Sequence, residues 1–348
     1  MSFKITGSGS CIPSVVQNND TFLNHSFYDE SGSEFDIENQ TIIEKFSSIT
    51  GINQRKYISA NLTTSDIAYQ AAKSAIKDAD IDPETLDYII LAHNFGDITC
   101  NSKQIDTLPS LASRVKAKLK IKNPECIAYD VLFGCPGWIE GMIQAQAFIK
   151  AKMAQKCLVI GADALSRVID SHDRDSMIYA DGAGASMIEA SKGKGGILSH
   201  KTVTYTSEGE ADFIFYGPSN DKGKGTKYIK MHGRKVYEFA LSKVPLALKK
   251  CLETSGKSID DVKKIFIHQA NLKMDDAIVK RFYKLYGKAM PNNVLPMNIQ
   301  EFGNSSVATV PTLFDLVLKE NYGGHELKTG DLILFASVGA GMNINAIT

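Results

Sequence analysis

The sequence lacks the features that mark secreted, membrane-spanning and disulfide-rich proteins. Its six cysteines, at positions 11, 100, 126, 135, 157 and 251, form no CxxC pair and follow no regular spacing, which argues against a disulfide framework or a zinc site. No apolar run approaches the ~20 residues of a membrane helix, and residues 1–5 do not open a signal peptide. We therefore expect a soluble cytoplasmic protein without membrane insertion.

Charge of one sign and metal-binding motifs are missing as well. Basic and acidic residues balance at 39 each with no long block of either, so nothing points to a nucleic-acid partner. The histidines show no HExxH or comparable spacing, and the glycine-rich residues 181–185 and 339–341 lack the spacing of a phosphate loop. We expect no metal and no cofactor, and we interpret these glycines as strand kinks or close backbone approaches.

What the sequence does contain is a pattern that occurs twice. Helical periodicity over residues 65–76 leads through a turn at Pro83 to a buried strand over residues 88–92. The second half repeats this order, with a helix that ends at Leu252, a polar turn and a strand over residues 265–268. Because the chain has 348 residues, two fused halves are a natural organisation.

Further matches lie at nearly the same offset. Residues 157–161 resemble residues 332–336, and residues 133–135 resemble residues 302–304. Chance similarity among short apolar segments is the alternative explanation. Strands that are apolar on nearly every residue and alternate with helices predict an α/β protein with largely parallel sheets, covered on both faces.

The predicted boundary between the two halves lies near the middle of the chain. We divide it into residues 1–190 and 191–348, and residues 192–196 (KGKGG) are the best candidate for the join. If a pseudo-twofold axis relates the halves, the loops that carry Cys135 and Asn304 meet at the seam, where they would share an active site.

Cys135 follows an apolar run and precedes Pro136. Proline is favoured at the first helical position, so the sequence predicts Cys135 at a helix N-terminus. The partial positive charge there favours the thiolate, which is the reactive form. A small buried hydrophobe is the alternative role for this cysteine.

His268 and Asn304 are the other candidates for chemistry. His268 ends a predicted strand, and ligands bind at strand ends in open α/β sheets, where a histidine supports a thiolate or donates to a carbonyl. Asn304 precedes a run of small residues and has an amide that can donate to an oxygen gaining negative charge. The alternatives are a structural histidine and a helix N-cap.

Three segments together resemble the ketoacyl-acyl-carrier-protein synthase III family. They are residues 134–135 (GC), 268–271 (HQAN) and 303–306 (GNSS), which occur in that family's order and approximate spacing. The resemblance spans almost the whole chain. It implies an α/β thiolase-like fold, in which two duplicated α/β halves form a five-layered arrangement, and a homodimer.

The resemblance also implies an acyltransferase that forms a carbon–carbon bond. Cys135, His268 and Asn304 would be catalytic, and the backbone N–H groups of Cys135 and Ala340 would bind the oxyanion. Cys135 would hold the acyl group while His268 and Asn304 stabilise the enolate of a second thioester. The substrates would be acyl-carrier-protein or coenzyme A thioesters, and the pathway would be fatty acid or polyketide biosynthesis. An acyl-transferring or acyl-binding protein of the same fold without condensation is the alternative.

Further positions match those that bind substrate or carrier protein in the family. Leu108, Arg167 and Asn271 are the substrate-binding candidates. Carrier proteins are acidic, and charge complementarity steers such encounters. The carrier-docking candidates are therefore basic residues on the helix predicted after His268, namely Lys273, Lys280 and Arg281. A solvated helix face is the alternative for them.

Two departures from the family pattern concern the substrate. Lys45 and Ile49 occupy positions where relatives often carry a tryptophan and an arginine, which favours a carrier-protein donor over coenzyme A. The lengthened segment before Leu108 resembles specialised members that make dialkylresorcinol lipids. Malonyl and 3-oxoacyl thioesters both remain open as the second substrate.

Overall fold

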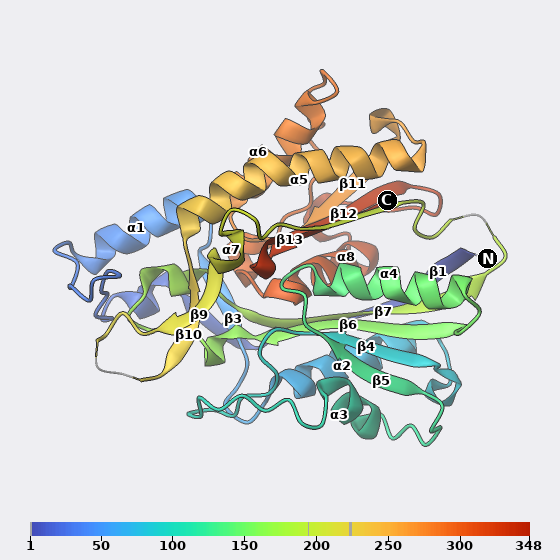
Figure 1. Ribbon diagram of the computed structural model, residues 1–348, viewed down its shortest axis with the longest axis horizontal. Coiled ribbons are helices and arrows are strands. Elements are labelled where there is room, and N and C mark those ends of the chain that lie inside the picture. Colours follow the sequence, from blue (N-terminus) through green and yellow to red (C-terminus); the bar gives the residue numbers. More distant parts are fainter. Residues whose placement is uncertain (1, 194, 223–224) are drawn as a thin grey trace.

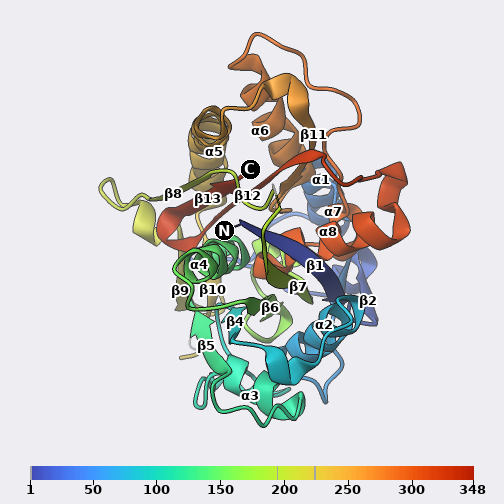
Figure 2. The same ribbon diagram turned by 90° about the vertical axis from the view of Figure 1, so that its right-hand side faces the viewer.

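A layer of helices separates two β-sheets in the computed structural model, which describes residues 2–193, 195–222 and 225–348. Further helices cover the outer face of each sheet, so the chain forms five layers in the order helix, sheet, helix, sheet, helix (Figures 1 and 2). The helices of the central layer are α4 (Gly137–Lys150) and α8 (Thr309–Glu320), and each contacts both sheets.

The first sheet has the strand order β1-β7-β6-β4-β5. Its strands are β1 (Ser2–Cys11), β4 (Tyr88–Ala92), β5 (Ile127–Val131), β6 (Lys156–Ala164) and β7 (Asp181–Ser191). The strand β4 pairs in parallel with β5 and β6, whereas β7 pairs antiparallel with β1 and β6. The outer face is covered by α2 (Thr64–Asp78) and α3 (Leu111–Lys118).

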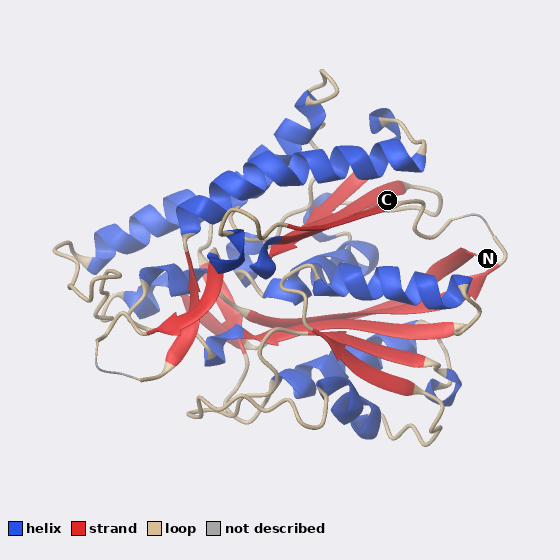
Figure 3. Cartoon of the chain, viewed as in Figure 1, coloured by secondary structure: helices blue, strands red, loops and turns tan. Residues whose placement is uncertain are grey.

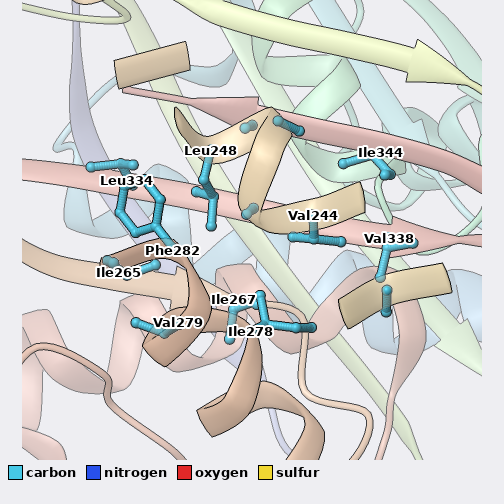
Figure 4. Close-up of a cluster of buried hydrophobic side chains, with 14 of the residues drawn as sticks. Val244, Leu248, Ile265, Ile267, Ile278, Val279, Phe282, Leu334, Val338 and Ile344 are labelled. Atoms are coloured by element: carbon cyan, nitrogen blue, oxygen red, sulfur yellow. The ribbon is translucent and has the colours of Figure 1, made fainter. Parts of the chain in front are cut away.

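The second sheet has the order β11-β12-β13-β8. Its strands are β8 (His200–Thr204), β11 (Val262–Ile267), β12 (Leu332–Gly339) and β13 (Asn343–Ile347). The helix α5 (Gly233–Ser255) lies on the outer face and packs against α6 (Leu272–Lys284). Figure 4 shows side chains of these two helices, among them Val244, Leu248 and Phe282, packed with strand residues such as Ile265 and Leu334.

Smaller elements lie around the two sheets (Figure 3). Two antiparallel pairs form from β2 (Val15–Asn18) with β3 (Gln54–Tyr57), and from β9 (Ile214–Pro218) with β10 (Lys227–Met231). The remaining α-helices are α1 (Asn39–Thr50) and α7 (Ile299–Phe302). Short 3₁₀ helices span Asn19–Phe22, Pro83–Thr85, Leu165–Arg167, Arg174–Ile178, Glu210–Asp212, Ile259–Asp261, Ser306–Ala308, Tyr322–Gly324 and Ala340–Met342. Within the described part of the chain, no helix has both the length and the apolar composition needed to cross a membrane.

The repeat expected from the sequence is present in the topology. In each half a long helix, a 3₁₀ turn and a buried strand follow one another, as α2 to β4 and as α5 to β11. Next to that strand comes a parallel neighbour, β6 or β12, and then an antiparallel one, β7 or β13. The duplicated thiolase-like fold is thus confirmed. The division at residues 190 and 191 falls at the end of β7 and stays a prediction, and Lys194 of the expected join lies outside the described residues.

The expectation of largely parallel sheets is wrong. Only β4–β5, β4–β6 and β11–β12 are parallel, and the other ladders of both sheets are antiparallel. The apolar strand pattern reports burial of both faces, which the layered arrangement imposes on central strands such as β4 and β6 whatever the direction of their neighbours. The chain also returns from β6 to β7 through short 3₁₀ turns rather than through a crossover α-helix.

A shared apolar core joins the halves across the central layer. Trp138 on α4 lies edge-on to Phe335 on β12, with 5.4 Å between ring centroids, and Phe314 on α8 lies 5.1 Å from the same ring. The cluster continues into the first sheet through Ile90 and Val159. Edge-to-face contacts of this kind add to the stabilisation from burial. The inner faces of the two sheets therefore pack on one common core.

The contact between α8 and β7 depends on the absence of a side chain at Gly184. A Cβ atom there would lie 2.7 Å from Cβ of Pro311 and 2.8 Å from the backbone nitrogen of Thr312. We expect Gly184→Ala to lower the free energy of unfolding by about 1–3 kcal/mol, because α8 must move away from the sheet. Urea unfolding measures this. Gly225→Ala is the matched control, since a Cβ at Gly225 meets no atom of the described residues within 4 Å; equal stability of the two variants would contradict the prediction.

Candidate active site

Cys135 lies in the connection from β5 to α4. The helix begins two residues later, and Pro136 is its N-cap rather than its first residue. The predicted location of Cys135 near a helix N-terminus is therefore confirmed, although the helix begins one residue later than expected. Gly134 has a φ of 67°, and a Cβ on it would lie 2.9 Å from both N and O of Ala340. A Cβ on Gly339 would lie 2.5 Å from N of Cys135. The backbones of the two halves are therefore in direct contact at the cysteine.

This contact bears on the two predicted oxyanion donors. The N–H groups of Cys135 and Ala340 belong to the two backbone segments that touch, one from each half of the chain. The glycines that permit the contact confirm the expected close backbone approach at residues 339–341. The oxyanion role of the two N–H groups stays a prediction.

His268 follows directly after β11 and is buried. Its backbone N–H donates to O of Ala336 at 2.9 Å, which holds the residue against β12. The ring nitrogen Nδ1 lies 2.8 Å from Oγ1 of Thr309, so Nε2 is the nitrogen left for a ligand. Burial lowers the pKa of His268 to about 4, which leaves the ring neutral at pH 7.

Asn304 is held at both its backbone and its side chain. Its N–H donates to O of Ile178 at 2.9 Å, and its carbonyl accepts from N of Ala180 at 2.8 Å. The side-chain Oδ1 accepts from N of Ser306 at 2.8 Å, so the Nδ2 donor is the other end of the amide. The side-chain oxygen of Asn304 therefore bonds the start of the 3₁₀ helix Ser306–Ala308. This contact orients the amide and does not use its Nδ2 donor.

Ser306 connects the three predicted catalytic residues. Its Oγ donates to Sγ of Cys135 at 3.3 Å, and its N–H donates to Asn304 as described above. Its carbonyl accepts from Oγ1 of Thr309 at 3.0 Å, and as an acceptor for the His268 ring the backbone of Ser306 raises the pKa of that histidine, against the larger effect of burial. Ser306 has a φ of 53°, a left-handed conformation that is uncommon outside glycine. Sequence reasoning missed this residue, although it stands in the 303–306 motif.

The expected lowering of the Cys135 pKa is wrong. Burial, with a smaller contribution from the negative charge of Asp163, raises the pKa of the thiol to about 12, although the hydrogen bond from Ser306 lowers it. Desolvation of the thiolate thus outweighs the favourable end of α4. Cys135 itself keeps part of its surface exposed. The resting residue is a thiol that a substrate can still reach.

Asp163 is a second residue that sequence reasoning missed. It lies on β6 and is 1% exposed. Its Oδ1 accepts from the backbone N–H of Asn94 at 2.9 Å, and its Oδ2 accepts from Nδ2 of the same residue at 2.7 Å. Nδ2 of Asn94 also lies 2.9 Å from Oγ of Ser306. A single carboxylate within the apolar run 157–164 was the available signal.

A cavity of about 480 Å³ borders the site at Ile178, whose carbonyl holds Asn304. It lies between α1, α5 and α6 and is lined by Asn271 together with Lys45 and Ile49 of α1. The apolar lining includes Ile42, Phe46, Met177, Met231, Val236 and Met274. The residues singled out as departures from the family pattern are therefore part of this wall.

The three substrate-binding candidates differ in their placement. Asn271 lines the cavity and also caps α6, with Oδ1 accepting from N of Met274 at 3.0 Å. Arg167 donates from Nη2 to O of Ser59 at 2.9 Å and contacts none of the three predicted catalytic side chains through the hydrogen bonds of the described residues. Leu108 is 87% exposed, so it lines no enclosed pocket of its own chain.

The three docking candidates lie on α6 and are exposed. Lys280 forms an ion pair with Asp276 at 2.7 Å, and Nη1 of Arg281 donates to O of Leu241 at 3.2 Å. An exposed ion pair of this kind contributes little to stability. The role of all three in docking stays a prediction.

The duplicated five-layer fold, with Cys135, His268 and Asn304 gathered at the seam, defines the class of thiolase-fold condensing enzymes, which are acyltransferases. Residues 129–206 match the family model "3-Oxoacyl-[acyl-carrier-protein (ACP)] synthase III", and residues 252–348 match the model for its C-terminal part. The chain belongs to the 3-oxoacyl-acyl-carrier-protein synthase III family, and it is a ketosynthase.

Individual relatives support this assignment over the full chain. The β-ketoacyl-acyl-carrier-protein synthase III of Erythrobacter litoralis is 31% identical, with 98% of this chain and 97% of the relative covered. The crystal structure of 3-oxoacyl-acyl-carrier-protein synthase III from Aquifex aeolicus has a TM-score of 0.82 at 29% identity and covers 99% of both chains. The priming β-ketosynthase of the R1128 polyketide pathway, at 22% identity and a TM-score of 0.82, covers 99% of this chain and 95% of its own and shares the fold.

The buried state of His268 predicts a specific pH dependence of stability. Its pKa is about 4 when folded, below the unfolded value of about 6.5, so only the unfolded chain takes up this proton between these values. As the pH falls from 6.5 to 4, we expect the free energy of unfolding of the unmodified protein to drop by up to about 3 kcal/mol more than that of His268→Gln. Urea unfolding across this range measures the difference. His200→Gln, at an exposed position, is the control, and parallel curves for His268→Gln and the unmodified protein would contradict the prediction.

Proposed function

We propose that this enzyme forms a carbon–carbon bond in two half-reactions at the seam between its halves. Cys135 first takes an acyl group from a thioester, and the enolate of a second thioester then attacks that acyl group. The observation that carries the proposal is the arrangement around Ser306, which holds the sulfur of Cys135 and the amide of Asn304 at one place, next to His268. A nucleophile and two neutral donors are what the two steps require.

In the first half-reaction Sγ of Cys135 attacks the carbonyl carbon of the acyl thioester. A new carbon–sulfur bond forms, the bond to the donor's sulfur breaks, and the donor leaves as a thiol. Negative charge gathers on the carbonyl oxygen, and the N–H groups of Cys135 and Ala340 are the proposed donors to it. Their backbones are in contact through Gly134 and Gly339, so the pair is preorganised.

In the second half-reaction His268 and Asn304 donate to the thioester oxygen of the attacking enolate. For this role the Thr309 hydroxyl must turn its proton from O of Ser306 to Nδ1 of His268, which places the ring proton on Nε2. Asn304 donates from Nδ2, because its Oδ1 is occupied by Ser306. A neutral imidazole suits this task, since burial disfavours the charged form. An acyl-binding protein without condensation would have no enolate for this pair to stabilise.

We assign the cavity beside Ile178 to the arm of the incoming thioester. The names of the relatives contain the acyl carrier protein, which supports a carrier-protein thioester, and coenzyme A thioesters carry the same reactive group. Lys45 and Ile49 line the cavity where relatives often carry a tryptophan and an arginine, which supports a carrier-protein donor. The extender is a malonyl or a 3-oxoacyl thioester, and release of labelled CO₂ from malonyl carrier protein distinguishes the two.

We also propose that each chain consists of two halves, residues 1–190 and 191–348. Two such chains form a homodimer. The edge strand β5 ends the first sheet, and Ile127 on it is 48% exposed. Leu132, just beyond β5, is 68% exposed. An open edge flanked by apolar side chains is a surface that a second copy can cover. Sedimentation at equilibrium tests the dimer, and a monomer at micromolar concentration would argue against it.

Substitution of the three proposed catalytic residues separates the half-reactions. We expect Cys135→Ala to abolish the acyl adduct and all product. His268→Ala and Asn304→Ala should keep a measurable adduct but reduce condensation by roughly 100- to 1,000-fold, because each removes one donor to the enolate. Intact-protein mass spectrometry after incubation with an acyl carrier protein measures the adduct, and product formation measures condensation.

The matched control for the nucleophile is Cys100→Ala. Cys100 is the other cysteine that is partly exposed, and the remaining four are buried. We expect this variant to acylate and condense like the unmodified protein. Turnover by Cys135→Ala would refute the nucleophile, and unchanged condensation by Asn304→Ala would refute the role of the amide.

Charge reversal tests carrier docking on α6. We expect Lys273→Glu to raise KM for an acyl carrier protein roughly fivefold at low salt and to leave KM for the coenzyme A thioester unchanged, because rim charges act mainly on the encounter rate. Lys257→Glu, an exposed lysine beyond the end of α5, is the control. Equal effects of the two substitutions would mean that α6 has no special part in docking.

A further inference from the structure

Asn343 lies where the two halves of the chain meet, yet neither half-reaction described above uses it. It is the first residue of β13, pairs with Gly339 across the turn from β12, and is 8% exposed. The turn itself is the 3₁₀ helix Ala340–Met342, which begins with one of the two proposed oxyanion donors. An amide buried at this place is costly unless it is hydrogen-bonded.

The side-chain amide of Asn343 bonds both halves at once. Nδ2 donates to O of Ala340 at 2.8 Å, and it makes a longer hydrogen bond of 3.4 Å to O of Phe133 in the first half. At the other end of the amide, Oδ1 accepts from Oγ1 of Thr204 on β8 at 2.6 Å. The two carbonyl oxygens can only accept, and an amide nitrogen carries two protons, so the end that faces the loops is the nitrogen.

The two bonded carbonyl groups lie next to the proposed oxyanion donors. Only Gly134 separates the carbonyl of Phe133 from the N–H of Cys135, and the other carbonyl belongs to the same residue as the N–H of Ala340. Gly134 and Gly341 have φ values of 67° and 93°, and glycine is the residue whose backbone rotates most freely. A side chain that holds both carbonyls therefore restricts how the two N–H groups can turn.

The backbone of the turn is closely packed against this amide and against the cysteine loop. A Cβ atom on Gly341 would lie 2.8 Å from Nδ2 of Asn343. A Cβ atom on Gly339 would lie 2.5 Å from N of Cys135. The position of the turn relative to Cys135 is thus set by direct backbone contact on one side and by the Asn343 amide on the other.

We propose that Asn343 is a positioning residue for the oxyanion site, and that its amide holds the N–H groups of Cys135 and Ala340 where both can donate to one oxygen atom. The inference rests on the proposed function, because it takes these two N–H groups as the donors to the carbonyl oxygen of the acyl group. Asn343 acts through two backbone loops and supplies no group to the reaction itself.

Both half-reactions depend on this pair of donors. Attack of Sγ of Cys135 on the first thioester places negative charge on the acyl carbonyl oxygen, and attack of the enolate on the acyl-enzyme does so again at the same carbonyl. Loss of the Asn343 amide should therefore slow acylation as well as condensation, whereas loss of Asn304 should leave acylation measurable. Preorganised donors act on the developing charge, so their displacement lowers the rate more than it weakens substrate binding.

Two reactions of Cys135 separate a loss of oxyanion stabilisation from a general loss of structure. Acylation by a thioester needs the oxyanion donors, whereas alkylation by iodoacetamide is a displacement at a saturated carbon, in which no carbonyl oxygen gains charge. For Asn343→Ala we expect the acylation rate at saturating donor to fall roughly 10- to 100-fold, while KM changes by less than about threefold. The alkylation rate should stay within about twofold, because the substitution adds no charge near the thiol.

Mass spectrometry measures both reactions on the full-length protein. Intact-protein spectra give the rate of adduct formation with acyl carrier proteins that are loaded with acetyl, octanoyl or palmitoyl groups. Peptide spectra give the rate of alkylation at Cys135 and separate it from that at Cys100, the other partly exposed cysteine.

Asn345→Ala is the matched control. Asn345 is two positions further along β13, so its side chain lies on the same face of the strand, but its Nδ2 donates to Oε2 of Glu140 on α4 at 3.0 Å. We expect this variant to lose stability and to keep the ratio of the acylation rate to the alkylation rate.

Thr204→Val is a second variant that tests the same contact if Asn343→Ala does not fold. Valine has the shape of threonine but lacks the hydroxyl group that holds Oδ1 of Asn343. We expect acylation to fall roughly three- to tenfold at an unchanged alkylation rate, which corresponds to the loss of one hydrogen bond.

An unchanged acylation rate in Asn343→Ala would overturn the inference, and so would a parallel fall of acylation and alkylation. If Asn343→Ala does not fold, unchanged acylation in Thr204→Val overturns it instead. The same loss of the rate ratio in Asn345→Ala would also count against a special part for Asn343. The proposed function fails by a different result, namely that the unmodified protein forms no adduct on Cys135 with any of the loaded carrier proteins.

Discussion

The backbone and side chain of Ser306 are the constraint on which the site depends. This one residue, in a left-handed conformation, contacts Cys135 through its hydroxyl, orients Asn304 through its N–H and acts on His268 through its backbone. Strained backbone of this kind persists only where the surrounding structure over-determines it. Here the surroundings are the central helix layer, because Ser306 precedes α8 and Cys135 precedes α4. The packing of the two halves therefore sets the geometry of the chemistry.

Burial governs the protonation of the site. It keeps His268 neutral and Cys135 a thiol, and for the cysteine this is the opposite of what the nearby N-terminus of α4 would favour. A neutral imidazole can donate to an enolate without needing to lose a charge first. A protonated thiol, by contrast, must lose its proton before or as the sulfur attacks a thioester. The same desolvation raises the pKa of Asp163, whose charge acts on the sulfur.

Several features could be predicted from residues alone, and others could not. The repeat of helix, turn and strand is visible because buried strands and capped turns leave local patterns, as at Pro83 and at residues 258–261. The three proposed catalytic residues stand in recognisable motifs. Strand direction was mispredicted, because the pattern of β6 and β7 reports burial on both faces and not the path of the chain between them. The cysteine pKa was mispredicted because the helix end is a local feature, whereas desolvation depends on everything packed around the sulfur.

The sequence by itself determined the family, the duplicated α/β plan and the chemical identity of the nucleophile and donors, since these depend on residue types and on short-range order. The tertiary structure alone decided which polar groups meet. Asn94 and Ser306 are 212 positions apart, and Ser306 and Cys135 are 171 positions apart, yet each pair is within hydrogen-bonding distance. No local pattern encodes such contacts, because they arise when two halves pack their cores together. The protonation states then follow from the burial that this packing creates.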